Sequence, residues 1–71
     1  MEGTPIGRWK VDNFVILQRK ADHSPLHVHV FRSDDEIGRY DLEHNRWMEG
    51  PYDAEAQANR AVARWKREHG F

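Results

Sequence analysis

Histidine is the residue type whose spacing in this chain most directly suggests chemistry. His27 and His29 are separated by one valine, and His23 lies four positions before them. Alternate side chains of a β-strand project from one face about 6.5–7 Å apart, so the two imidazoles could converge on one metal ion. Zinc or another divalent metal would need further ligands. The chain offers Asp41 and Glu43 for this role, and the predicted metal set is His23, His27, His29 and His69.

The same pair of histidines also suits acid–base catalysis. Because histidine titrates near neutral pH, His27 and His29 could donate and accept a proton in one reaction, as metal-independent RNA cleavage requires. A ribonuclease or phosphodiesterase also needs cations for the phosphate. The candidates are Arg32, Arg39 and Arg46, and a helical ridge of Arg60, Arg64 and Arg67 that could contact phosphate or a partner. A third interpretation assigns no ligand, because histidines and arginines are ordinary on solvated faces.

Length and composition limit the classes of protein to which the chain can belong. Its 71 residues predict one domain, and the absence of cysteine excludes both a disulfide scaffold and a thiolate zinc site. The 11 basic and 12 acidic residues nearly cancel, which does not indicate a dedicated nucleic-acid binder. The sequence contains neither a secretion signal nor an apolar run long enough for a membrane span. We therefore expect a cytoplasmic protein without a membrane contact.

The first two thirds of the chain read as short strands and turns. Residues 1–8 are expected to be an irregular lead-in, and residues 9–50 to hold the strands. The bulky, β-branched run 14–17 predicts one strand. The alternation in residues 26–31 predicts another strand, with Leu26, Val28 and Val30 facing the core and the histidines facing water.

Two more strands are expected after the acidic turn at residues 32–36. Residues 37–42 alternate in polarity, and residues 46–49 could add a short fourth strand. Gly38 interrupts the third strand and predicts a bulge or the close approach of another group.

A helix is predicted over residues 53–69. Asp53 is a suitable N-cap, and Gly70 a suitable stop. The residues expected to face the core are Ala54, Ala58, Ala61, Val62 and Trp65, whose spacing places them on one face. The predicted fold is therefore α+β, with a three- to four-stranded antiparallel sheet followed by one C-terminal helix packed on one face.

The segment DHSPLHVHV resembles the small prokaryotic family catalogued as domain of unknown function 4160. That family shows aspartate–histidine, then prolines, then histidine, an apolar residue and histidine. The matching positions here are Asp22, His23, Pro25, His27 and His29. Leu26 departs from the pattern, because the family usually has a second proline there.

Outside this segment the resemblance is less specific. Gly7 fits an early glycine of the family, residues 48–50 fit a segment ahead of the helix, and Trp65 and His69 fit a W-x3-H motif near the helix end. The resemblance implies a sheet followed by a helix, histidine-rich positions and no established reaction. It also implies an arrangement beside another small protein, as in toxin–antitoxin modules.

These observations lead to one functional hypothesis and two alternatives. The first is a small intracellular interaction module of a toxin–antitoxin-like or mobile-element system, which binds a protein partner, or a second copy of itself, through a sheet edge or the polar helix face. The second is a histidine-dependent ribonuclease or phosphodiesterase, or a metal-binding protein, using His27 and His29. The third is a phage-type inhibitor of a nucleic-acid-handling complex, suggested by the acidic turn at residues 33–36.

Overall fold

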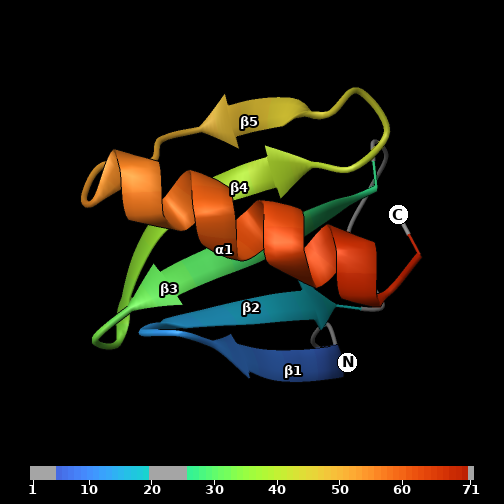
Figure 1. Cartoon of the computed structure of the whole chain (residues 1–71), viewed down its shortest axis with the longest axis horizontal. Coiled ribbons are helices and arrows are strands. Elements are labelled where there is room, and N and C mark those ends of the chain that lie inside the picture. The colour runs from blue at the N-terminus through green and yellow to red at the C-terminus, as the bar shows by residue number, and fades with distance from the viewer. Residues whose placement is uncertain (1–4, 20–25, 71) are drawn as a thin grey trace.

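The computed structural model describes residues 5–19 and 26–70 as five strands followed by one helix (Figure 1). The elements are β1 (Pro5–Val11), β2 (Phe14–Arg19), β3 (His27–Arg32), β4 (Asp35–Asp41), β5 (Arg46–Glu49) and α1 (Glu55–Glu68). The strands form one antiparallel sheet in the order β1-β2-β3-β4-β5, so each strand pairs with its neighbour in the chain. Helix α1 crosses one face of this sheet, and the predicted α+β fold is confirmed.

The sheet has one strand more than the sequence predicted, because residues 9–19 contain a hairpin. Val11 pairs with Phe14, which leaves Asp12 and Asn13 as a two-residue loop, and Asp12 adopts a left-handed φ of 55°. The irregular lead-in predicted up to residue 8 was wrong from Pro5 onwards, since β1 begins there.

The acidic turn predicted at residues 32–36 is confirmed at Ser33 and Asp34 only, because β3 ends at Arg32 and β4 begins at Asp35. Ser33 and Asp34 have φ values of 52° and 70° and connect the paired residues Arg32 and Asp35. Two left-handed residues match the right-handed twist of the strands, which is why such turns dominate two-residue hairpins.

Gly38 lies at both features predicted for it, a bulge and a close approach. The register between β3 and β4 shifts beside it, because Val30 pairs with Gly38 whereas Phe31 pairs with Glu36. A methyl group at Gly38 would lie 2.6 Å from the carbonyl oxygen of Glu49 on β5. The absence of a side chain therefore lets β5 lie against β4 at this point.

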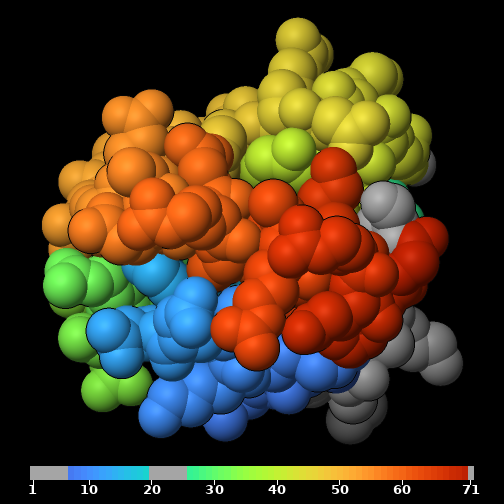
Figure 2. Space-filling view, viewed as in Figure 1, coloured from blue at the N-terminus to red at the C-terminus, as the bar shows by residue number. Residues whose placement is uncertain are grey.

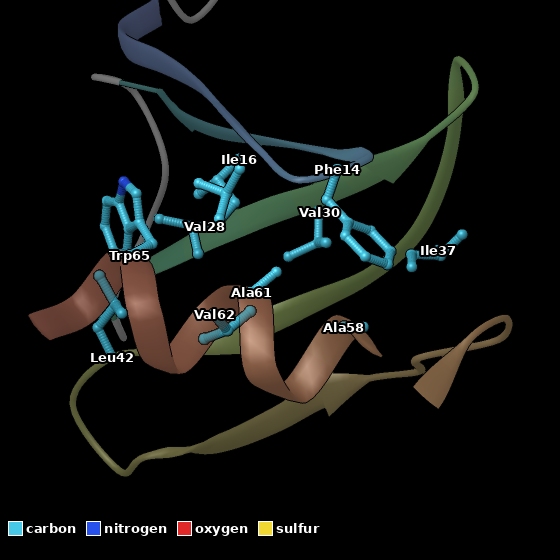
Figure 3. Close-up of a cluster of buried hydrophobic side chains, with 11 residues drawn as sticks. Phe14, Ile16, Val28, Val30, Ile37, Leu42, Ala58, Ala61, Val62 and Trp65 are labelled. Atoms are coloured by element: carbon cyan, nitrogen blue, oxygen red, sulfur yellow. The ribbon is translucent and has the colours of Figure 1, made fainter. Parts of the chain in front are cut away.

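The hydrophobic core lies between the sheet and α1 (Figure 3). Val28 and Val30 are fully buried and point toward the helix, as predicted, whereas Leu26 precedes β3 and is 40% exposed, so its assignment to the core was wrong. The predicted helix face supplies Ala58, Ala61, Val62 and Trp65 to the core. In the space-filling view the helix side chains cover the middle of this sheet face, between the blue β1–β2 hairpin and the yellow β5 region (Figure 2).

Trp65 is the largest fully buried side chain of the described residues. Its ring meets the ring of Trp9 on β1 edge to face, with 5.1 Å between centroids, and stacks on His69 at an interplanar angle of 27°. Alanines on the same helix face allow this large ring to reach the sheet, because their small side chains keep the helix close.

The helix begins at Glu55, which is one residue later than it would begin if Asp53 were the N-cap. Ala54 is the N-cap, with a left-handed φ of 50° and no side-chain cap, whereas Asp53 accepts a hydrogen bond from Arg32. The prediction that Asp53 caps the helix was therefore wrong. The helix ends at Glu68, and Gly70 follows with φ of 76°, as expected of a helix stop. In the described part of the chain, no helix has the length and apolar character needed to cross a membrane.

Replacing Ala54 with glycine is expected to raise the free energy of unfolding, by up to about 1 kcal/mol. An L-residue in the left-handed region carries a penalty of about 1–2 kcal/mol, which glycine avoids. Part of this gain is lost because glycine also increases the conformational entropy of the unfolded chain. Urea denaturation measures the change. The matched control Ala63→Gly, at an exposed position inside α1, should instead lose about 1 kcal/mol. A loss of similar size in both variants would contradict the role assigned to Ala54.

Candidate functional site

The two predicted histidines of β3 lie on the sheet face turned away from α1. Successive side chains of a strand alternate between faces, and Val28 and Val30 occupy the helix side. His27 and His29 are nevertheless only 6% and 8% exposed, and their ring centroids are 5.1 Å apart. The interpretation of these histidines as a solvated strand face is therefore wrong.

His29 is held by a carboxylate from the neighbouring strand. Its Nδ1 lies 2.7 Å from Oε2 of Glu36. The bulge beside Gly38 places Glu36 opposite Phe31, two residues along β3 from His29, so the carboxylate can reach the ring diagonally. Leu17 and Arg39 are the direct cross-strand neighbours of His29. The imidazole therefore lies within a packed, polar layer of the sheet.

Asp41 pairs with His27 across the strands and organises the following turn. The residue is 2% exposed, and its Oδ1 accepts backbone N–H bonds from Glu43 at 2.8 Å and from His44 at 3.0 Å. Its Oδ2 lies 2.7 Å from Nδ1 of His44. Burial alone would raise the pKa of Asp41, but these hydrogen bonds and the charge of His44 outweigh it, so the pKa lies below its ordinary value. Asp41 therefore remains ionised at neutral pH.

Replacing Asp41 with asparagine is expected to destabilise the protein at neutral pH and to flatten its acid unfolding. Because the pKa of Asp41 is lower in the folded protein, the unfolded chain binds more protons as the pH falls. The stabilisation by Asp41 is therefore complete above its ordinary pKa of 3.8. It is lost as the pH falls through the pKa of the folded state. Thermal unfolding midpoints measured from about pH 7 to pH 2 test this dependence. The exposed Asp35→Asn variant is the control. An Asp41→Asn variant with the wild-type pH slope would refute this account.

Among the described residues, the predicted metal ligands do not form one cluster. His69 lies 5.0 Å from Trp9 and 5.1 Å from Trp65 between ring centroids, on the helix side of the sheet, whereas His27 and His29 lie on the other side. His23 falls outside the described residues. Glu43 accepts the backbone N–H of Leu26. Within residues 5–19 and 26–70, no group of three or more potential ligands is placed to hold a metal ion.

The predicted arginine ridge is on the exposed side of α1, but its members differ. Arg64 lies 3.4 Å from Asp12 of the β1–β2 loop and 3.3 Å from Glu68, whereas Arg60 and Arg67 are exposed. Two of the other predicted phosphate contacts are also engaged. Arg32 pairs with Asp53, and Arg39 pairs with Glu49.

An apolar hollow opens on the sheet face turned away from α1. It measures about 220 Å³ and is lined by Arg8, Val15, Leu17, Phe31 and Asp34. We call the sheet face that holds this hollow the outer face. Its residues are Arg8 and Lys10 of β1, Val15 and Leu17 of β2, His27, His29 and Phe31 of β3, and Glu36, Arg39 and Asp41 of β4.

A second hollow surrounds the β4–β5 turn and contains a histidine that the sequence analysis overlooked. It measures about 490 Å³ and is lined by Asp41, His44, Arg46, Trp47 and Met48. The signal was present as an aspartate at a strand end with a histidine three positions later, which is the spacing at which a turn can join them.

No protein-family model, curated protein or solved structure matches the chain.

Proposed function

We propose that the chain is a small interaction module that binds a protein partner through the outer face of its sheet. The observation that carries this proposal is the uncovered apolar centre of that face. Val15, Leu17 and Phe31 are only half-buried around the 220 Å³ hollow, although they lie in the middle of a sheet. An exposed apolar patch bordered by charge is typical of a protein–protein contact.

The charges around the hollow define the chemistry of the partner. Arg8 and Lys10 lie on the β1 side of the apolar centre, while Asp34 and Glu36 lie on the β3–β4 side. A complementary surface would place one apolar side chain in the hollow, an acidic group toward β1 and a basic group toward the β3–β4 turn. Such a pattern favours one orientation of the partner and discourages others.

The size of the face is sufficient for this role. The molecule extends 33 × 24 × 21 Å, and its broad face is comparable with the roughly 800 Å² that each partner buries in a standard interface. The alternative, a ribonuclease that uses His27 and His29, requires the substrate to reach two residues that are only 6% and 8% exposed. Their burial therefore counts against catalysis by this pair.

Photo-crosslinking from the outer face tests the proposal. A photoreactive phenylalanine analogue at Val15, introduced in cells that naturally express the chain, is expected to yield one discrete protein adduct. The same analogue at Ala63, on the exposed side of α1, should not yield it. Leu17→Glu in the Val15-labelled chain should abolish the adduct without a change in circular dichroism, because Leu17 is only half-buried.

Two results would count against this function. Equal labelling from Val15 and Ala63 would show contact without a defined surface, and an adduct that survives Leu17→Glu would place the contact elsewhere. An adduct of twice the chain mass, formed also by the purified protein, would identify a second copy as the partner.

A further inference from the structure

The turn between β4 and β5 holds an aspartate–histidine pair, in which Asp41 ends the outer face and His44 lies beyond it in the turn. Asp41 fixes the ring of His44 through a 2.7 Å bond to Nδ1, and its other oxygen is occupied by two backbone N–H groups. The carboxylate is 3% exposed at its side chain, whereas the His44 side chain is 58% exposed. The buried partner therefore orients an exposed imidazole.

This orientation has a chemical consequence for the second ring nitrogen. Because Nδ1 faces the ionised carboxylate, it carries a proton, and Nε2 points away from Asp41. His44 lines the 490 Å³ hollow, and its Nε2 is the ring nitrogen that the bond to Asp41 leaves for other partners. A carboxylate that orients an imidazole in this way fixes both its tautomer and its direction.

Arg46 places a second donor at the same hollow. It pairs with Asp41 across β4 and β5, is exposed and lines the hollow together with His44. A guanidinium presents a planar fork of N–H groups, which suits the oxygens of a phosphate better than a single-point cation does. Protonated His44 adds a single directed donor beside this fork.

The other charged groups near the turn do not cancel this arrangement. The carboxylate of Glu43 accepts the N–H of Leu26 at 2.6 Å, and Lys66 of α1 donates to Asn45 and lies 5.3 Å from the Tyr40 ring centroid. The negative charge of Asp41 is already engaged by three donors inside the turn. The donors that an anion in the hollow can contact are therefore His44 and Arg46, against the repulsion of the Asp41 carboxylate that also lines it.

We propose that His44 and Arg46, with Asp41 as the positioning residue, form a binding site for a phosphate group. The site binds the tetrahedral oxyanion between Nε2–H of His44 and the guanidinium of Arg46. Donation from Nε2–H while Asp41 holds Nδ1–H uses both ring nitrogens as donors, as in the protonated form of histidine. The phosphate could belong to a small phosphomonoester or to a nucleic-acid backbone, which share this chemistry.

An NMR titration of the ring resonances of His44 tests the site. Inorganic phosphate, added at one fixed pH, is expected to produce a saturable shift of the Cε1 proton of His44. Arg46→Gln should weaken the affinity about tenfold, because it removes a charge-assisted contact. The matched control Arg60→Gln, at an exposed arginine on α1, should leave the affinity unchanged.

Two further arms make the outcome decisive. Sodium chloride at matched ionic strength should not reproduce the shift. A linear shift, a shift shared with chloride or an unaffected Arg46→Gln variant would overturn the proposal. A short oligothymidylate that binds at His44 more tightly than phosphate would assign the site to a nucleic-acid backbone, whereas binding of inorganic phosphate alone would assign it to a small phosphomonoester.

Discussion

Trp65→Ala is expected to remove a large share of the free energy of unfolding. Trp65 is fully buried, and its ring contacts those of Trp9 and His69. Truncating a buried tryptophan to alanine costs about 3–5 kcal/mol, whereas a domain of 71 residues has a total stability of about 4–11 kcal/mol. Urea denaturation followed by far-ultraviolet circular dichroism measures the loss.

The neighbouring Arg67→Ala variant is the control for this experiment. Arg67 is exposed on the same helix, so its replacement should change stability by no more than about 0.5 kcal/mol. Trp65→Phe should fall between the two variants, because it keeps part of the buried ring surface. A Trp65→Ala variant that unfolds cooperatively within about 1 kcal/mol of the wild type would show that the core does not depend on this ring.

Gly38→Ala is expected to lower the free energy of unfolding by about 2–3 kcal/mol, the upper part of the range for overpacked sites. The added methyl group would lie 2.6 Å from the Glu49 carbonyl oxygen and 2.9 Å from the Trp47 ring. A ring can rotate, but the carbonyl belongs to the backbone of β5, so the two strands must separate. Chemical denaturation gives the loss, and amide exchange in β5 should increase.

Gly70→Ala separates this steric effect from a general glycine effect. Gly70 has φ of 76°, but among the described residues no heavy atom beyond its chain neighbours lies within 4 Å of the position of its added methyl group. Its replacement should cost only the left-handed penalty of about 1 kcal/mol. If Gly38→Ala were no more harmful than Gly70→Ala, the close approach of β4 and β5 would not matter for stability. Combining Gly38→Ala with Trp47→Leu should not restore stability, since the carbonyl contact remains.

Much of the fold could be predicted because it follows from the spacing of apolar residues within single elements. The period-two alternation of Val28 and Val30 placed β3, and the spacing of Ala58, Ala61 and Trp65 placed the helix face. The extra strand was missed although Asp12 and Asn13 are residue types that favour turns. The loop is only two residues long, and the glycines and the proline of residues 1–8 indicated an irregular segment before it.

The candidate sites were harder to predict because they depend on contacts between strands. Alternation correctly separated the histidines of β3 from its valines, but the burial of His29 depends on Glu36, whose position follows from a bulge. The pairing of Asp41 with His44 depends on the shape of one turn. The prediction of the helix N-cap was wrong for a related reason, because Asp53 pairs with Arg32, which lies 21 positions earlier in the chain.

The meander order of the sheet has a consequence for how the chain folds. Every strand pairs with the one before it, so each hairpin can close over a short loop without waiting for distant segments. Such local connectivity lowers the relative contact order and favours rapid folding. The helix comes last and covers the apolar side of a sheet whose strands all precede it. Docking of α1 is therefore the step that shields this surface from intermolecular association, and slowing that step would expose the chain to aggregation.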